Sequence, residues 1–464
     1  MHRLFTLLFC FLFFVSQAQS GYQINIKTKN IQSDSLFIKD YNVKNKTFNT
    51  FLSFKFENNI TLKAQTPLNA GIYTVETDSV VLCEFLISDA KNQKFTLSVL
   101  EDGIYVEGSK ENSANRAYMK QMFEFEQQLG ILNADFMQKQ RSGASKEVMA
   151  LFVDSLTLLF DKIYIEKRTY QEKMIAENKG TLLASIIQGS LETPPPPKES
   201  LRDRVKYYSF MAEHLFVDFP WNDDRLLKTP VLYNKFKTFA QHIFQLESAF
   251  SIPPVIKALN DSKINRKMYY ALFDYLEHEF GSYKSPYRDE LLYIAMLKNI
   301  LQTPDLEEAR QMRYTYELKL IDKNHEGEPA PDFNMLLSTG DTTSLYAYEA
   351  ELLMLYFQNP DCPTCGELRN KMKNMELVNR AIASGKLKIL TIYFEEDENL
   401  WRNYLNTRAF TNWNHGWNYD FHIREEHLYD IRVIPMIMFL DKNKKIIKKD
   451  LLSNEIEDWL KRFL

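Results

Sequence analysis

The chain has 464 residues, of which 45% are hydrophobic and 25% are charged, and it carries a formal net charge of −4. This length and composition predict a globular protein of several domains whose cores need no disulfide staples. The slightly acidic balance argues against a nucleic-acid-binding protein, because sequence-independent binding to phosphates requires a strongly basic surface.

Residues 1–18 predict a secretory signal peptide. Positions 1–3 are short and basic, positions 4–15 form an apolar core, and positions 16–18 supply small residues for cleavage. The apolar core is shorter than the roughly 20 residues that a membrane span requires, and no later segment supplies such a span. We therefore expect a periplasmic or secreted protein that is not integral to the membrane, and Cys10 would leave with the signal.

Residues 19–112 predict an antiparallel β-sandwich domain. Apolar and polar residues alternate in segments 22–26 and 51–56, and a further strand-like segment follows at 71–75. Such alternation is typical of strands with one buried face. Cys83 lies in an apolar run of this region, and we interpret it as a small buried residue without a catalytic role.

Residues 113–325 predict an all-α domain. Segments 148–177 and 268–280 contain no glycine and are rich in long-chain and aromatic residues, which favours helices. Four consecutive prolines from Pro194 predict an extended spacer, because proline neither continues a helix nor donates a backbone hydrogen bond. The aromatic stretch 207–221 fits a buried helix core better than a ligand groove.

Residues 326–464 predict an α/β domain, because strand-like and helix-like segments alternate after Pro329 and Pro331 end the helical region. The predicted elements are strand 352–357, helix 366–375, strand 387–394, helix 399–405, strands 436–440 and 446–449, and helix 453–464. Alternation of this kind predicts a central sheet covered by helices.

The motif CPTC, from Cys362 to Cys365, lies between the first of these strands and the helix that follows it. A thiol at a helix N-terminus is surrounded by unpaired backbone N–H groups and by the positive end of the helix dipole, which lowers its pKa. We therefore predict that Cys362 is the nucleophile. Cys365, one turn further on, is placed to attack the mixed disulfide and acts as the resolving thiol.

Four features together resemble the thioredoxin superfamily, and within it the secreted thiol-disulfide oxidoreductases of the TlpA and ResA type. They are the segment GEPAPDF at 327–333, the strand leading into CPTC, the segment VIPM at 433–436, and the closing hairpin and helix. The resemblance implies that Pro435 is a cis-proline beside the redox pair, and that Ile434 binds an extended substrate segment through its backbone.

The resemblance extends to the rest of the chain. The β region and the helical middle are similar to uncharacterised domains that precede such modules in envelope proteins of Bacteroidetes. Neither of these two resemblances assigns a function. They could hold a client protein or dock a reductant, because a bare thioredoxin fold offers only a small contact surface around its cysteine.

Two positions depart from the family pattern. Many relatives have an aromatic residue before the first cysteine, whereas Asp361 precedes Cys362 here, and its charge would oppose a thiolate if the two side chains faced each other. Tyr356 stands where thioredoxin has a buried acid that assists proton transfer. Glu367 and Glu395 are candidate substitutes for that acid, although both fit exposed carboxylates better.

The leading hypothesis is a periplasmic reductase or isomerase of protein or peptide disulfides that uses no cofactor and no metal. Cys362 would attack a substrate disulfide, Cys365 would release the product, and an external thiol donor in the cell envelope would restore the dithiol. An oxidase would use the same residues in reverse, and the two residues between the cysteines do not decide the direction.

Three alternatives stay open. A peroxiredoxin would need a threonine three residues before its reactive cysteine, a place that Asn359 takes relative to Cys362. A structural zinc site could combine the two cysteines with His415, His422 or His427. An envelope binding or scaffold protein could carry a redox-inactive or regulatory thioredoxin-like module as a docking unit.

Overall fold

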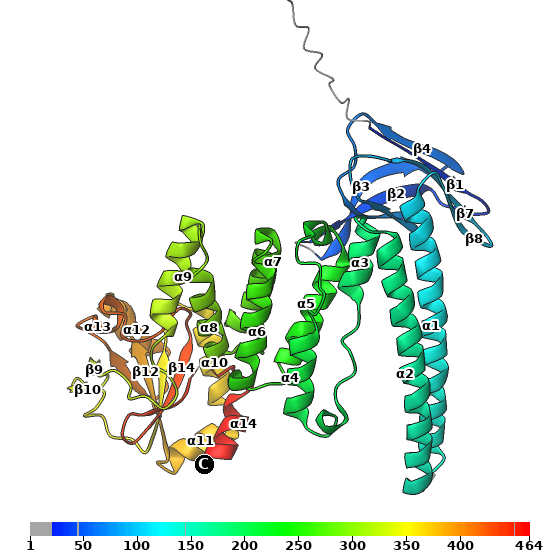
Figure 1. Cartoon of the computed structure of the whole chain (residues 1–464). Coiled ribbons are helices and arrows are strands. Elements are labelled where there is room, and N and C mark those ends of the chain that lie inside the picture. Colours follow the sequence, from blue (N-terminus) through cyan, green and yellow to red (C-terminus); the bar gives the residue numbers. More distant parts are fainter. Residues whose placement is uncertain (1–20, 44–45, 144, 450) are drawn as a thin grey trace, which may run out of the picture. The chain divides into compact units, whose positions relative to one another are not determined.

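The computed structural model describes residues 21–43, 46–143, 145–449 and 451–464 (Figure 1). The predicted signal peptide at residues 1–18 and Cys10 lie outside these residues. The chain divides into two compact units, Met1–Tyr275 and Leu276–Leu464. None of the helices in the described part of the chain has the length and apolarity needed to cross a membrane.

The N-terminal unit begins with a β-sandwich of two four-stranded sheets, whose strand orders are β4-β1-β7-β8 and β3-β2-β5-β6. Its strands are β1 (Tyr22–Thr28), β2 (Ser35–Asn42), β3 (Thr47–Lys55), β4 (Asn59–Ala64), β5 (Gly71–Thr77), β6 (Val81–Ile87), β7 (Lys94–Leu100) and β8 (Gly103–Glu107). Alternate residues face one shared core, to which Ile24 of the first sheet and Leu36 of the second both contribute.

The predicted β-sandwich is confirmed, with one departure from antiparallel pairing. Strands β1 and β7 run parallel, with Ile24 opposite Phe95. Alternation reveals that a segment is a strand but not which way its neighbour runs, so this pairing was not predictable from the pattern. Cys83 is buried in β6, as predicted, and burial raises the pKa of its thiol to about 12.

The remainder of the N-terminal unit is helical. The helices are α1 (Lys110–Arg141), α2 (Lys146–Glu177), α3 (Leu182–Ser190), α4 (Arg204–His214), α5 (Pro230–Ile243), α6 (Ser248–Ser262) and α7 (Arg266–Leu276), with short helices η1 (Lys198–Ser200) and η2 (Asp224–Lys228). Helix α1 begins after Ser109, whose side chain accepts the N–H of Asn112. Figure 1 shows α1 and α2 as a long pair lying side by side.

The aromatic stretch of this helical region is core, as predicted. Phe216, Phe219 and Trp221 are buried and contact one another, with ring centroids 4.6 to 5.4 Å apart. The proline segment from Pro194 forms no helix and separates α3 from η1. Both observations agree with the reading of these segments as packing and spacing elements.

The C-terminal unit opens with the short π-helical turn η3 (Glu277–Gly281) and with helices α8 (Glu290–Leu301) and α9 (Glu308–Ile321). The strands of the following α/β part are β9 (Asn334–Leu337), β10 (Thr342–Ser344), β11 (Leu352–Phe357), β12 (Leu387–Tyr393), β13 (Asn414–Trp417), β14 (Met436–Asp441) and β15 (Ile446–Lys449). Its helices are α10 (Pro363–Lys373), α11 (Glu376–Ala383), α12 (Glu398–Thr407), α13 (His422–Glu425) and α14 (Ile456–Phe463). The sheet order is β10-β9-β13-β12-β11-β14-β15.

Strand β11 lies in the interior of this sheet, next to its middle strand β12. It pairs in parallel with β12 and antiparallel with β14, and all six of its residues are buried. Leu355 and Phe357 face one core, while Met354 and Tyr356 face the other, where they pack with Met372 of α10. Burial on both faces explains why this strand is a continuous apolar run rather than an alternating one.

The predicted multidomain fold class is confirmed: β-sheets at the N-terminus, helices between residues 110 and 321, and a C-terminal α/β part. Five elements of that part were missed, namely β9, β10, β13, α11 and α13. Most of these are three or four residues long, too short for periodicity to appear. The predicted domain limits at 112/113 and 325/326 stay predictions.

Candidate active site

Cys362 lies where the buried strand β11 leads into helix α10. It is the N-cap residue of α10, and Pro363 occupies the first helical turn. The backbone N–H of Cys365 donates to Cys362 Sγ over 3.2 Å. The sulfur thereby accepts an N–H group that the first turn of a helix leaves unused, at the positive end of the helix dipole.

The two thiols of the motif have opposite pKa shifts. Burial raises the pKa of the Cys362 thiol, but hydrogen bonds from Cys365 and Thr364 outweigh burial, so that the pKa lies below its ordinary value. The Thr364 Oγ1 is 3.1 Å from Cys362 Sγ. Cys365 is buried, and burial together with its hydrogen bond to Cys362 raises the pKa of its thiol to about 12. This difference fits one attacking thiolate and one protonated reserve thiol.

The structure brings Ile434 and Pro435 to the same place. The peptide bond between them is cis, and the carbonyl oxygen of Ile434 lies 4.0 Å from Cys362 Sγ. Among the described residues, neither the N–H nor the C=O of Ile434 forms a backbone hydrogen bond, because β14 starts only at Met436. Peptide groups left open in this way can pair with an extended segment of another chain.

Tyr356 takes the place beneath the cysteines where the family has an acid. Its hydroxyl donates to the carbonyl oxygen of Cys365 over 2.7 Å, and burial raises the pKa of the phenol well above its usual range. The two candidate substitutes lie elsewhere: Glu367 is exposed, and Glu395 forms an ion pair with Arg424 at 3.2 Å. Neither carboxylate contacts the thiols.

A buried arginine lies beside the two cysteines instead of an acid. Arg369 is 5% exposed, its guanidinium donates to the side-chain oxygen of Gln358, and it lies 4.9 Å from the centre of the Tyr404 ring. Within the described residues it forms no ion pair with a carboxylate. Its positive charge acts to lower the pKa of Cys365, although burial prevails. The sequence signal was the four-residue spacing from Cys365, which places both on one helix face.

Asp361 does not stand alone beside Cys362. Its carboxylate pairs with Arg408 at 3.2 Å, and the same guanidinium donates to the carbonyl oxygen of Pro360 over 3.0 Å. Arg408 thus neutralises a charge that would oppose a thiolate at Cys362, and it ties the loop before the motif to the end of α12. An open cavity of about 610 Å³ lies next to this contact, with Cys362 in its wall.

The histidines of the zinc hypothesis contact different groups. His415 is buried, where its ring nitrogens bond the Thr391 hydroxyl at 2.8 Å and the Phe410 carbonyl oxygen at 3.0 Å. His422 lies 3.7 Å from an Asp420 oxygen. In the part of the chain that the structure describes, no three His, Cys, Asp or Glu side chains gather as a metal site would require.

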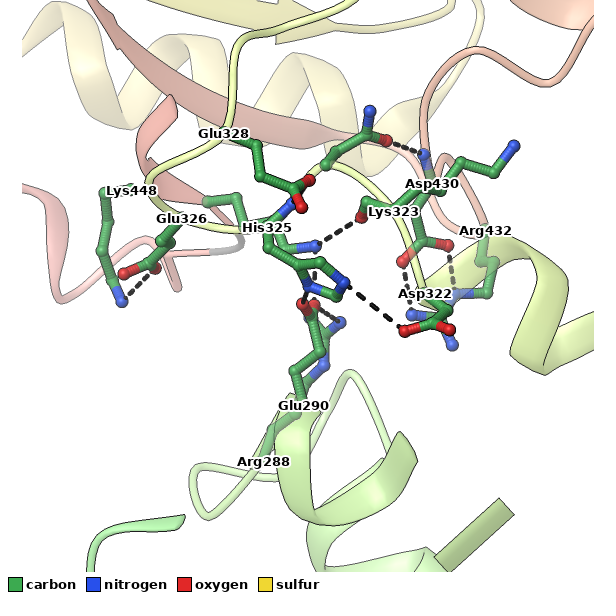
Figure 2. Close-up of polar contacts among 12 residues, drawn as sticks. Arg288, Glu290, Asp322, Lys323, His325, Glu326, Glu328, Asp430, Arg432 and Lys448 are labelled. Atoms are coloured by element: carbon green, nitrogen blue, oxygen red, sulfur yellow. Dashed lines mark hydrogen bonds and ion pairs between the residues drawn. The ribbon is translucent and has the colours of Figure 1, made fainter. Parts of the chain in front are cut away.

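A polar network supports the loop that carries the cis-proline (Figure 2). Arg432 binds the buried carboxylate of Asp430 through two contacts of 2.6 Å. Tyr283, from the segment before α8, donates its hydroxyl to the same carboxylate over 3.2 Å, and its ring centre lies 4.4 Å from the Arg432 guanidinium. Residues far apart in sequence therefore hold the loop just before Ile434.

The same network continues to the segment between α9 and the sheet. Figure 2 shows His325 between two carboxylates, with Glu290 at 2.9 Å and Asp322 at 3.6 Å. Glu290 also pairs with the buried Lys449 of β15 at 2.7 Å. Helix α8 is thus tied by charge to the edge of the sheet.

A buried strand that leads into a Cys-x-x-Cys helix, with a cis-proline before the neighbouring strand, defines a thioredoxin-like fold. Comparison with known families agrees. Residues 350–446 match the family described as Thioredoxin-like, and residues 166–324 match a domain of unknown function, DUF5106.

The chain is also similar to solved structures of other proteins. A thioredoxin-like protein from Bacteroides caccae is 26% identical, with a TM-score of 0.54, over 59% of this chain and 98% of its own. The C-terminal domain of an uncharacterized protein from Bacteroides fragilis is 34% identical over 30% of this chain and 98% of its own, with a TM-score of 0.29. No protein with a curated function matches the chain. The C-terminal module of this chain is therefore thioredoxin-like, and it is similar to thiol-disulfide oxidoreductases of the TlpA/ResA type.

Proposed function

We propose that the protein is a thiol-disulfide oxidoreductase that reduces or isomerises disulfides of protein substrates outside the cytoplasm. The observation that carries this proposal is the placement of Cys362, whose sulfur lies at the start of α10, has a lowered pKa and faces the carbonyl oxygen of Ile434. The location is supported by the predicted signal peptide at residues 1–18. The thioredoxin-like match of residues 350–446 supports the reaction class.

Reduction proceeds in two exchange steps. The Cys362 thiolate attacks one sulfur of the substrate disulfide, a mixed disulfide forms, and the other substrate sulfur leaves as a thiolate that takes up a proton. Cys365 then loses its proton and attacks Cys362 Sγ, which releases the second substrate thiol and leaves a disulfide between the two cysteines. Two electrons have passed from the protein to the substrate, and an external dithiol donor returns them.

The substrate segment binds in extended form beside the redox pair. The N–H and C=O of Ile434, which have no backbone partner among the described residues, hold its backbone, and Pro435, which has no N–H, leaves no donor to be satisfied next to the sulfur. The raised pKa of Cys365 keeps the second thiol protonated until the mixed disulfide has formed. The order of the two steps follows from this difference between the thiols.

The test compares insulin-disulfide reduction by the wild type and by Cys362→Ser. We expect the substitution to abolish reduction, and equal rates for the two proteins would remove the catalytic proposal. A Cys365→Ser variant should accumulate mixed disulfides in cells, because the resolving thiol is gone. Mass spectrometry of these adducts would identify substrates and electron donor together.

A binding or scaffold role is the second candidate, and one observation favours it. No Asp or Glu carboxylate contacts Cys362 or Cys365 in the described part of the chain, whereas the family pattern has a buried acid there. In a scaffold, Ile434 and its neighbours would still bind an extended segment, but the thiols would not exchange. The insulin assay separates the two roles.

A further inference from the structure

The cavity beside Cys362 is distinct from the cis-proline side of the active site. Its wall combines the start of α10 with the residues that follow α12, and it includes Cys362, Gly366 and Phe410. Neither Ile434 nor Pro435 is among the described residues that line it. A substrate segment paired with Ile434 therefore leaves this cavity open for a neighbouring side chain on the other flank of the sulfur.

The charges around the cavity do not cancel. Its wall holds two arginines, Arg369 and Arg408, but one carboxylate, Asp361, which is already paired with Arg408. A third cation lies next to the wall, since Lys373 Nζ is 5.0 Å from the centre of the Phe410 ring. The cavity is therefore cationic with one aromatic wall, a combination that suits a carboxylate on a short apolar stem.

Arg369 gives this cavity the character of a built site. It is 5% exposed, and a buried guanidinium without a counter-ion is costly. Of its five N–H donors, one donates to Gln358. Its Nη2 lies next to Gly366, where an added Cβ would be 3.6 Å away, and both residues line the cavity.

We propose that this cavity is a substrate subsite that takes a carboxylate located close to the substrate's disulfide, with Arg369 as its principal partner. The carboxylate would complete the ion pair that Arg369 lacks within the described residues, and Phe410 would pack against the stem that carries it. The substrate class is therefore a disulfide-bonded peptide with an acidic side chain near its cysteine. This inference rests on the proposed disulfide chemistry and adds the selection of substrate to it.

The experiment uses two disulfide-linked peptides that differ only by Glu or Gln two residues from the cysteine, and measures kcat/KM for the reduction of each by the full-length protein. We expect the wild type to prefer the Glu peptide by about tenfold, as one charge-assisted hydrogen bond at the low end of its usual range implies, and the preference to shrink as salt is added. In Arg369→Gln the preference should fall to about twofold or less. A second arm measures kcat/KM for oxidised glutathione, which also carries carboxylates. It tests whether a small disulfide is taken as well as a longer peptide.

Two further variants keep the test decisive if Arg369→Gln folds poorly. Gly366→Ala retains both arginines but adds a methyl group next to Arg369 in the cavity wall, and we expect it to reduce the Glu preference as well. Lys371→Gln removes an exposed cation of the same helix outside the cavity wall, and it should keep the full preference. If wild type reduces both peptides equally, the subsite is refuted while the proposed function stands. If neither peptide is reduced faster than by Cys362→Ser, the proposed function itself fails.

Discussion

The hydroxyl of Thr364 is the side-chain group whose removal tests most directly what lowers the pKa of Cys362. Its Oγ1 lies 3.1 Å from the sulfur, and its hydrogen bond is one of those that lower the pKa of Cys362. Thr364→Val removes this donor and keeps the shape of the side chain. We therefore expect the pKa of Cys362 to rise.

The size of the effect follows from the hydrogen bond that is lost. A hydrogen bond to a charged group contributes about 1.5–3 kcal/mol, and the low end applies because Cys362 is partly exposed. A loss of about 1.4 kcal/mol lowers the thiolate fraction about tenfold at pH values below the pKa. The less acidic thiolate is also the better nucleophile, so alkylation should slow by only about threefold there.

The assay is the pH dependence of alkylation by iodoacetamide, measured on a Cys365→Ser background so that one active-site thiol titrates. Cys83 is buried and should not react in the folded protein. Thr339→Val, in the turn after β9, is the matched control and should leave the profile unchanged. A midpoint that stays in place or moves to lower pH in Thr364→Val would refute the role of this hydroxyl.

Three further substitutions test other parts of the C-terminal unit. Arg432→Ala leaves the buried Asp430 carboxylate without its two-point partner, and we expect the free energy of unfolding in urea to fall by about 3–5 kcal/mol; a loss below about 0.5 kcal/mol would contradict the importance of this pair. Burial lowers the pKa of His415 below 6.5, so its neutral ring stabilises the fold above that pH and the stabilisation is lost as the pH falls. Wild type should therefore lose more stability than His415→Gln between about pH 7 and pH 5, and parallel curves would rule this out. Tyr356→Phe removes the donor to the Cys365 carbonyl oxygen, which should cost about 1 kcal/mol of stability and leave insulin reduction largely intact; complete loss of reduction would instead give the phenol a role in the chemistry.

The residues at the centre of the candidate site could be found in the sequence because each has a local signal. Cys362 and Cys365 follow an apolar run and open a helix, and Pro435 precedes a strand. Strand β11 was predictable for the same reason, since six consecutive apolar residues fit a strand buried on both faces. These features depend on neighbours in the chain.

The groups that modify the site have no local signal of their contacts, even though the spacing of Arg369 from Cys365 places both residues on one helix face. Arg369 is a charged residue in a helix, and polarity alone predicts an exposed face, whereas the structure buries it over Tyr404. Arg408 reaches Asp361 across 47 residues of sequence. Strand β13 was not predicted because its four residues include a histidine and a glycine and show no strand pattern. Its pairing with β12 and β9 is what makes it a strand. Contacts at long range leave no local pattern to read.

The contacts of Tyr283 and Glu290 determine how this thioredoxin-like module could be transferred into another protein. A chimera joined at residue 326 would leave behind the hydroxyl that binds Asp430 and the carboxylate that binds Lys449, so two buried charges would lose partners. The graft would then carry both cysteines on an intact helix but a loosened Ile434 loop. A transferable cassette should therefore start at Leu276, where the compact unit itself begins.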